Sequence, residues 1–399
     1  MSNKSPKIVL APDSFKGCLT AKQDTEAMTA GILRGCPSAE VVCVPLSDGG
    51  EGFTESVLTA VGGRKIECVV LNPHGKEIIA AYAVLSDNAT VLIETAAASG
   101  LSLIDVRERN PFLATSYGTG QLIRAALDAG YRKFAIGLGG SATVDGGAGL
   151  VQALGAEFFD ANGTPIIQPM NNELLGDCGD IDLSGLHPAV KETTFIMASD
   201  VTNPLLGATG AVNIFAVQKG ATPEMLPALE NNLSRFYDLA ERKLGRMVRN
   251  VPGAGAAGGI GAGLLLFLNA TVRSGIEMVL ELTEFRQKIN DADLIVTGEG
   301  RIDEQTAFGK TIAGVLKCAG ERQIPVVAVA GKKEGKLDEL ARLGLREIFT
   351  LTERVANPED AFTRAPELIA QVGEEIARQQ FGGKDRNSRH FPPLAEPGQ

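Results

Sequence analysis

Short apolar runs alternate with segments of helical periodicity in two separate parts of the chain, one towards each end. The runs are rich in β-branched residues and are bounded by polar residues, glycine or proline, which is typical of buried strands. They lie at residues 7–10 (KIVL), 41–45 (VVCVP), 293–297 (DLIVT), 325–330 (PVVAVA) and 346–351 (REIFTL). Helices are expected at about residues 20–34, 51–61, 275–290, 311–321, 336–343 and 358–380, the first beginning at a capping box of Thr20 and Gln23. This alternation predicts a parallel sheet with helices on both faces.

The middle of the chain has a less regular pattern. Its expected strands lie at residues 77–85, 90–94, 133–138 and 194–198, and glycine-rich segments join them. We therefore predict an α/β protein of two domains, in which a second, mixed α/β domain is inserted into a discontinuous Rossmann-like (flavodoxin-like) domain with a parallel sheet. The first domain comprises residues 1–66 plus 276–380, the inserted domain residues 67–275, and a tail follows at residues 381–399. We expect the active site in a cleft between the two domains, because ligands often bind at such places.

Composition and charge narrow the class of protein. The 399 residues exceed what one hydrophobic core usually supports, and 44% apolar with 22% charged residues is ordinary for a globular protein. A net charge of −10 argues against nucleic-acid and membrane partners. The six cysteines lack zinc-binding spacing and the first residues lack a secretion signal, so we expect reduced thiols and a cytoplasmic location. The uncharged stretch 250–272 holds proline and several glycines, and we expect it to form a buried loop and helix rather than a membrane span.

Five segments share one design, in which an acidic residue follows an apolar strand in a polar or glycine-rich turn. They are APDSFKG (11–17), PLSDGGEG (45–52), GLGGSATVDGGAG (137–149), ASDVTNP (198–204) and TGEGRID (297–303). A single aspartate at such a place has a simpler explanation as a helix cap or turn residue. Because open α/β sheets bind ligands beyond the carboxyl ends of their strands, the five together favour a shared anionic ligand.

Phosphoryl transfer is the reaction that best uses these residue types. Mg2+ prefers carboxylate oxygens, phosphate oxygens accept from backbone N–H groups, lysine and arginine, and an acceptor hydroxyl needs a positioned aspartate. Nucleophilic hydrolysis fits less well, because there is no G-x-S-x-G elbow and none of the three histidines is placed as a catalytic base.

Two glycine-containing stretches resemble nucleotide-binding motifs but lack a feature that each motif requires. The Gly-Lys-Thr at 309–311 resembles the end of a P-loop, but Glu304 occupies the position that a P-loop gives to glycine. The G-x-G-x-x-G match at 253–258 follows Arg-Asn-Val-Pro rather than a strand, so it is weak evidence for a nicotinamide dehydrogenase. A non-catalytic sugar-acid sensor is a further alternative, although no basic helix-turn-helix segment is present.

Eight separated motifs resemble, in order and spacing, those of the type I glycerate kinases. They are APDSFKG, PLSDGGEG, the run from Glu94 to Leu101, TSYGTG, GGSATVDGGAG, DVTNPLLG, VPGAGAAGGIGAG and TGEGRID, and the resemblance covers about residues 7–380. It implies phosphorylation of glycerate with ATP and Mg2+, commonly at the 2-hydroxyl to give 2-phosphoglycerate. The alternatives are 3-phosphoglycerate as product and a related small hydroxy acid as substrate. A monomer or a homodimer is expected, and residues 214–220 depart from the family in having Ala-Val where Gly-Pro is common.

The candidates for a catalytic role are Asp200, Asp48, Lys16 and Arg301. Asp200 ends the strand FIMAS and is our first candidate for the base that activates the acceptor hydroxyl, a role that Asp48 or Asp13 could also fill. Lys16 and Arg301 each lie close to an acid in a turn and are candidate partners for phosphate or carboxylate. Arginine could hold the carboxylate of glycerate with two parallel hydrogen bonds.

The remaining site residues are assigned by the kind of group that they would bind. The substrate-binding candidates are Asp13, Ser14, Asn203, Glu299 and Gly255. For ATP, the candidates are a backbone cradle of Gly139, Gly140, Ser141 and Thr143, together with Lys310. Mg2+ is expected on one or two carboxylates among Asp48, Glu51, Asp145 and Asp303, with Glu299 as a further choice.

Overall fold

The computed structural model describes residues 5–307 and 310–382, and the chain divides into two compact units. Unit 1 consists of Met1–Asp48, Glu55–Val61 and Ile276–Gln399, and unit 2 of Gly49–Thr54 and Gly62–Gly275. The expected boundary at residue 66 falls inside a strand of unit 2 that begins at Gly63. The expected tail lies outside the described residues from residue 383 onwards.

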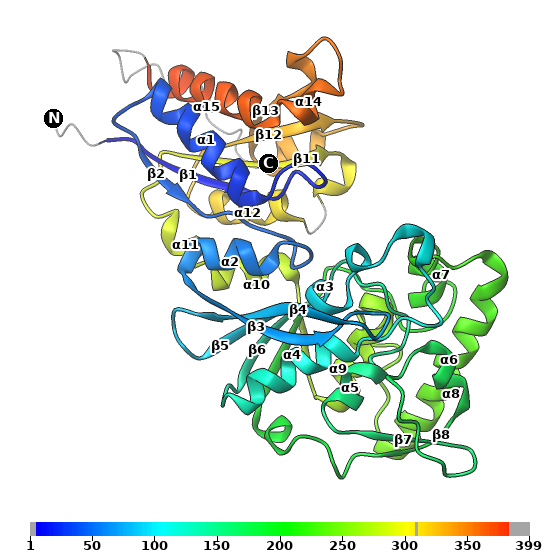
Figure 1. Cartoon of the computed structure of the whole chain (residues 1–399). Coiled ribbons are helices and arrows are strands. Elements are labelled where there is room, and N and C mark those ends of the chain that lie inside the picture. Colours follow the sequence, from blue (N-terminus) through cyan, green and yellow to red (C-terminus); the bar gives the residue numbers. More distant parts are fainter. Residues whose placement is uncertain (1–4, 308–309, 383–399) are drawn as a thin grey trace, which may run out of the picture. The chain divides into compact units, whose positions relative to one another are not determined.

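Unit 1 is built on a parallel sheet of five strands from both ends of the chain (Figure 1). The strands are, in their order across the sheet, β13(Leu345–Thr350), β12(Val326–Lys333), β11(Leu294–Ile302), β1(Lys7–Pro12) and β2(Glu40–Cys43). Counted along unit 1 alone, the order is 2-1-3-4-5, which is that of flavodoxin-like folds. The run KIVLAP of β1 is buried from Ile8 to Pro12 because the sheet is covered on both faces. The predicted α/β class is confirmed.

Helices cover both faces of this sheet. On one face α1(Ala21–Gly35) packs against α15(Ala365–Phe381), and a Cβ on Gly31 would lie 1.9 Å from the carbonyl oxygen of Ala370, so only glycine permits this approach (Figure 1). The other helices of this part of the chain are α2(Phe53–Val61), α10(Gly275–Leu282), α11(Phe285–Lys288), α12(Thr311–Gly320), α13(Asp338–Arg342) and α14(Asp360–Thr363). The helix expected at 275–290 is interrupted, because Glu284 adopts a left-handed conformation with φ 54°.

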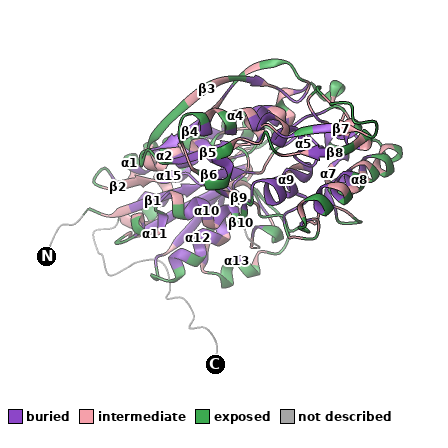
Figure 2. Cartoon of the chain, turned by 90° about the horizontal axis from the view of Figure 1, so that it is seen from below, coloured by how far each residue is buried: buried purple, intermediate pink, exposed green. Residues whose placement is uncertain are grey.

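Unit 2 is built on a mixed sheet of six strands. Their order is β10(Thr271–Arg273), β9(Thr194–Ala198), β6(Lys133–Gly137), β5(Thr90–Glu94), β4(Glu77–Leu85) and β3(Gly63–Leu71). The first four are parallel, while β4 and β3 are antiparallel to their neighbours. The central strands β5 and β6 are buried, whereas β3 forms a largely exposed edge (Figure 2).

The remaining elements of unit 2 pack around this sheet. A two-stranded antiparallel sheet joins β7(Glu157–Asp160) to β8(Cys178–Asp182). The helices are α3(Ala96–Ser99), α4(Tyr117–Asp128), α5(Ala148–Ala153), α6(Asn172–Asp177), α7(Ala211–Phe215), α8(Leu226–Leu244) and α9(Ile260–Phe267). Every residue of α9 is buried, so the uncharged stretch that contains it forms core. Among the described residues no helix combines the length and the apolar character that a membrane span requires.

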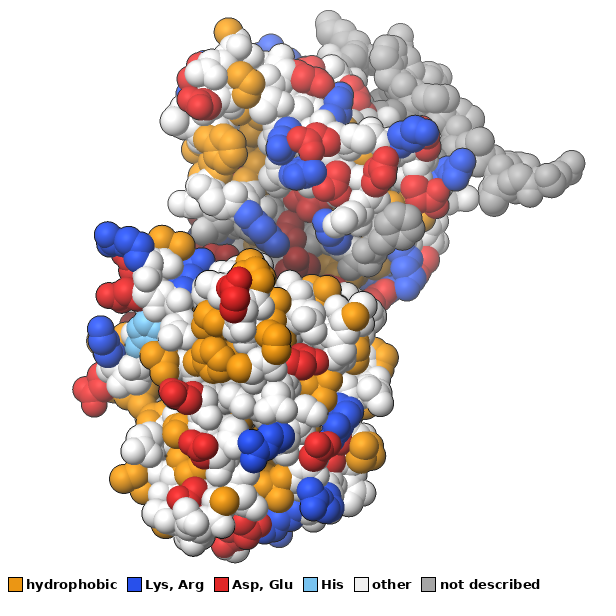
Figure 3. All heavy atoms as spheres, turned by 90° about the vertical axis from the view of Figure 1, so that its right-hand side faces the viewer, with side chains coloured by type: hydrophobic (Ala, Val, Ile, Leu, Met, Phe, Trp, Pro, Cys, Tyr) orange, Lys and Arg blue, Asp and Glu red, His pale blue; other side chains and the backbone are white. Residues whose placement is uncertain are grey.

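Charged side chains are mixed on the surface. On the face drawn in Figure 3, lysine and arginine side chains are interspersed with aspartate and glutamate and do not gather into one basic patch.

Candidate active site

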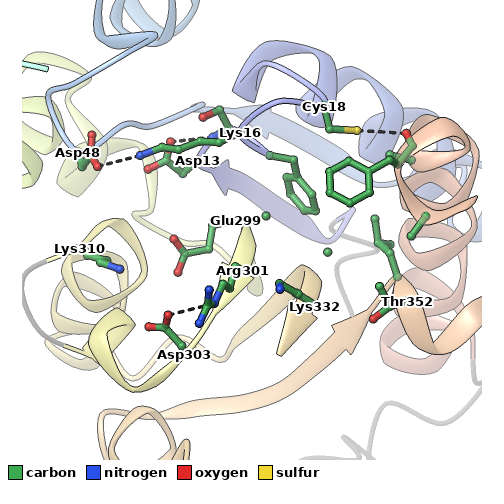
Figure 4. A pocket seen from close by; sticks show the side chains of 18 residues that line it. Asp13, Lys16, Cys18, Asp48, Glu299, Arg301, Asp303, Lys310, Lys332 and Thr352 are labelled. Carbon is green, nitrogen blue, oxygen red and sulfur yellow. Dashed lines mark hydrogen bonds and ion pairs between the residues drawn. The ribbon is translucent and has the colours of Figure 1, made fainter. Parts of the chain in front are cut away.

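A pocket of about 360 Å3 lies in unit 1, beyond the carboxyl end of β1 and beside the last residues of the neighbouring strand β11 (Figure 4). In a sheet of this strand order, the crevice between these two strands is the usual ligand site, because the chain leaves them in opposite directions. Four acidic and four basic residues line the pocket: Asp13, Asp48, Glu299 and Asp303, with Lys16, Arg301, Lys310 and Lys332. Ser14 also lines it, so the structure brings together eight of the site residues predicted from sequence.

Asp13 directly follows β1 and is 5% exposed. Its carboxylate accepts hydrogen bonds from the backbone N–H of Ser14 (2.7 Å) and from the hydroxyl of Thr311 (2.6 Å), the first residue of α12. Burial, with repulsion from Asp48, raises the pKa of Asp13 to about 6. Asp13 is thus a carboxylate of raised basicity, held in one orientation by two donors.

Glu299 lies on the neighbouring strand β11 and has a similar environment. Its Oε1 accepts a hydrogen bond from the hydroxyl of Thr306 (2.8 Å). Burial, with a further contribution from Asp13, raises the pKa of Glu299 to about 7. The pocket therefore contains two carboxyl groups that exchange protons close to neutral pH, which is the property that a general acid or base requires.

Lys16 reaches across the pocket to Asp48, with 3.4 Å between Nζ and Oδ2. Partial loss of water lowers the pKa of Lys16, but attraction to Asp48 and Asp13 outweighs this and raises the pKa overall. Lys16 therefore stays protonated at neutral pH and can bind an anion.

Arg301 is already engaged by two acids. Its Nε lies 3.3 Å from Asp303, and its Nη2 lies 2.7 Å from Glu334, which also pairs with Lys332 at 2.9 Å. Glu334 was missed from the sequence, although it directly follows β12, the strand that neighbours β11. An incoming carboxylate or phosphate would have to replace Glu334 as the partner of Arg301. Lys310 lies at the N-cap position of α12 and lines the same pocket.

The candidate magnesium ligands fall into different environments. Asp48 and Asp303 line the pocket, whereas Glu51 and Asp145 belong to unit 2. Asp145 is fully buried and accepts hydrogen bonds from Ser116 N (2.7 Å), Ser116 Oγ (2.6 Å), Gly147 N (3.1 Å) and Gly149 N (3.3 Å). This arrangement gives Asp145 a structural role in holding the glycine-rich turn.

The carboxylates of the pocket suit a Mg2+ ion that also binds phosphate oxygens. Within residues 5–307 and 310–382, no group of three or more His, Cys, Asp or Glu side chains could hold a metal ion by itself. Mg2+ usually relies on one or two carboxylates, water and phosphate oxygens, and the carboxylates of the pocket supply such oxygens.

The predicted phosphate cradle of unit 2 rests on a buried lysine. Lys219 is 3% exposed, and its Nζ donates to Ser141 Oγ (2.9 Å) and to the carbonyl oxygen of Thr143 (2.8 Å). Burial lowers the pKa of Lys219 to about 7. Gly139 and Gly140 precede Ser141 after β6, and a Cβ on Gly139 would lie 2.4 Å from the Cα of Gly50. Lys219 was not predicted from the sequence, because nothing in the residues around it, at the end of the 3-10 helix Val217–Lys219, indicates a site.

The other candidates in unit 2 have hydrogen bonds that fix their loops. Asp200 Oδ1 accepts from Ser274 Oγ (2.9 Å) and from the N–H of Gly275 (2.8 Å), the first residue of α10. Asn203 donates to the carbonyl oxygen of Thr209 (2.8 Å) and accepts, through its own carbonyl oxygen, from the N–H of Gly255 (3.0 Å). The structure thus places Asn203 beside Gly255 and gives Asp200 a helix-capping contact.

A flavodoxin-like sheet with a pocket of acidic and basic side chains between the strands where its order reverses is typical of α/β enzymes that bind phosphate-containing ligands. The sequence model of the Glycerate kinase family matches residues 8–380. The chain belongs to this family and is accordingly a phosphotransferase with glycerate kinase activity. Membership of a kinase family implies ATP as the phosphoryl donor.

Individual relatives cover nearly the whole chain. The Glycerate kinase of Bacillus subtilis (strain 168) is 44% identical over 93% of this chain and 97% of its own length. The Glycerate 2-kinase of Escherichia coli (strain K12) is 42% identical over the same shares. A crystal structure of a Salmonella typhimurium LT2 protein, described as a candidate glycerate kinase 2, superposes with a TM-score of 0.83 at 41% identity, over 95% of this chain and 99% of that chain.

Proposed function

We propose that the enzyme transfers the γ-phosphoryl group of ATP to the 2-hydroxyl of glycerate, giving 2-phosphoglycerate, and that the pocket of unit 1 binds the reacting groups. The observation that carries this proposal is the meeting of four acids and four cations where β1 and β11 end. The name of the Escherichia coli relative, Glycerate 2-kinase, supports the choice of hydroxyl.

The cations of the pocket divide between the two anionic substrates. Lys16 and Lys310 would hold phosphate oxygens of ATP, since both line the pocket and a lysine acts as a point charge towards phosphate. Arg301 would bind the carboxylate of glycerate in place of Glu334, because a guanidinium offers two parallel donors. Mg2+, when bound, would neutralise phosphate charge, with Asp48 and Asp303 as its proposed protein ligands.

Asp13 is the structure-based choice for the group that accepts the proton of the glycerate hydroxyl. A carboxyl group with a pKa of about 6 is mostly ionised at pH 7 and is a stronger base than an ordinary aspartate. Asp200, the first choice from sequence, is a second candidate for the base. It ranks below Asp13 because its Oδ1 already accepts two hydrogen bonds.

The proposal is tested by measuring ADP release from ATP with a series of hydroxy acids. The proteins compared are the wild type, Asp13→Asn and Asp200→Asn. The control variant is Asp177→Asn, which changes an exposed acid of unit 2. We expect turnover with glycerate in the wild type and the control, and a loss of about a hundredfold or more in kcat for Asp13→Asn, with ATP affinity retained within about threefold. A collapse in Asp200→Asn with near-normal turnover in Asp13→Asn would move the base role to Asp200. No ADP release with glycerate would refute the proposed function.

A further inference from the structure

The pocket of unit 1 has a second, apolar end that the phosphoryl-transfer chemistry does not use. Apolar side chains line it: Phe15, Leu351, Ala361, Phe362 and Ala365. Figure 4 shows Cys18 and Thr352 on the side of the pocket opposite Asp48 and Lys310, with Glu299 and Arg301 between them. Resting on the proposed function, we propose that this apolar end binds the adenine base of ATP and that Phe362 is the side chain on which the base stacks.

The apolar end combines a buried apolar surface with one exposed aromatic ring. Phe15, Leu351, Ala361 and Ala365 are at most 5% exposed and belong to one hydrophobic cluster of unit 1. Phe362, in contrast, is 62% exposed although it lines the same pocket. Cys18 Sγ donates to the backbone carbonyl oxygen of Phe362 (3.2 Å), and this hydrogen bond ties the backbone of α14 to the loop after β1.

ATP is the substrate whose chemistry matches both ends. Its triphosphate is anionic and suits Lys16 and Lys310, while its base has an aromatic face that suits a phenylalanine ring. Glycerate has three carbons and only polar substituents, so it has no group for an apolar surface. A pocket of about 360 Å3 is also within the usual range for ligand sites and is larger than glycerate needs.

A stacked base would cover the face of Phe362 that now contacts water. Stacking of a nucleobase on an aromatic side chain strengthens binding by about five- to 150-fold and tolerates different bases, because every base has a π-face. We therefore expect the apolar end to contribute affinity for the nucleotide and little to the rate of phosphoryl transfer.

Equilibrium binding of ATP and of inorganic triphosphate to the full-length protein, without glycerate, tests this role for Phe362. The variants are Phe362→Ala, Phe362→Tyr, which keeps the ring, and Met247→Ala, which shortens a 69% exposed apolar side chain of unit 2. For Phe362→Ala we expect the Kd of ATP to rise about tenfold and the Kd of inorganic triphosphate to stay within about twofold. The other two variants should bind ATP like the wild type.

Steady-state kinetics separates failure of this inference from failure of the proposed function. With Phe362→Ala we expect the KM of ATP to rise about tenfold, while kcat and the KM of glycerate change less than about twofold. An unchanged Kd for ATP would overturn the stacking role even if the enzyme phosphorylates glycerate. A rise in the KM of glycerate alone would also overturn it and assign the apolar end to the acceptor. Because nucleotide binding is measured without turnover, a tenfold loss of ATP affinity would support the inference even if glycerate were not the acceptor.

Discussion

The hydrogen bond from Thr311 to Asp13 makes the acid limb of the pH–rate profile a test of the pocket. The hydroxyl donates to Asp13 Oδ2 at 2.6 Å, and both residues are at most 5% exposed. Thr311→Val keeps the shape of the side chain but removes this donor, which stabilises the ionised carboxylate. A hydrogen bond to a charged group is worth about 1.5–3 kcal/mol, or about one to two pKa units, so the pKa of Asp13 should rise from about 6 by at least about one unit.

The expected loss of activity follows from the fraction of Asp13 that is ionised. At pH 6 this fraction falls from about one-half to about one-tenth for a shift of one unit, so kcat/KM should drop about fivefold. At pH 9 the carboxylate is ionised in both proteins, and the two rates should agree within about twofold. Discontinuous measurement of ADP from pH 5 to 9 avoids the pH dependence of coupling enzymes.

Thr311→Ser is the matched control, because it retains the hydroxyl and should retain the acid limb of the wild type. Glu299 contributes to the same limb, but its own donor is Thr306, which both variants keep. Acid limbs that superimpose for Thr311→Val and the wild type, or that move equally in the valine and serine variants, would refute an essential ionised Asp13.

Three further predictions concern stability, measured by urea unfolding. Asp24 is completely buried, and neither of its carboxylate oxygens makes a well-formed hydrogen bond to the described residues. Burial raises the pKa of Asp24 from 3.8 to about 8, so the folded protein should lose stability as the pH rises between these two values. Asp24→Asn should abolish this loss. Burial lowers the pKa of Lys219 from 10.5 to about 7. Between pH 7 and pH 9 the free energy of unfolding of the wild type should therefore rise by about 2–3 kcal/mol relative to that of Lys219→Met. Parallel plots of unfolding free energy against pH for the two proteins would contradict the burial argument. Gly31→Ala should cost several kcal/mol by clashing with Ala370, whereas Gly320→Ala, with no atom within 4 Å of its new Cβ, should change stability by less than about 1 kcal/mol.

The fold and part of the site could be predicted from sequence for a physical reason. Strands that are buried on both faces appear as continuous apolar runs, and the residues that follow them lie at the carboxyl edge of the sheet. Asp13 was found in this way, because it directly follows β1; Glu299 was found although β11 continues past the expected end at residue 297 to Ile302 and so contains it. The same pattern, an acid in a turn after a strand, also selected Asp145 as a magnesium ligand. In the structure the carboxylate of Asp145 is fully buried and accepts four hydrogen bonds from Ser116, Gly147 and Gly149.

What the sequence could not supply depends on contacts between distant residues. Asp13 and Asp145 both follow strands in polar turns. Asp13 lines a pocket, whereas the carboxylate of Asp145 is buried and accepts a hydrogen bond from the hydroxyl of Ser116. Glu334 pairs with Arg301 through the alignment of β12 with β11, and Lys219 reaches Ser141 from 78 residues away. Such partners follow from tertiary packing and leave no periodic pattern in the chain.

The phosphorus spectrum of the product tests the central claim most directly. We predict that full-length protein with ATP and glycerate yields ADP and a phosphate ester whose 31P signal is a doublet, because the phosphorus of 2-phosphoglycerate couples to the single proton on C2. The same reaction with Asp13→Asn should give almost no ester. A triplet would show phosphorylation at C3, and an undiminished yield from Asp13→Asn would contradict a reaction carried out in the pocket of unit 1.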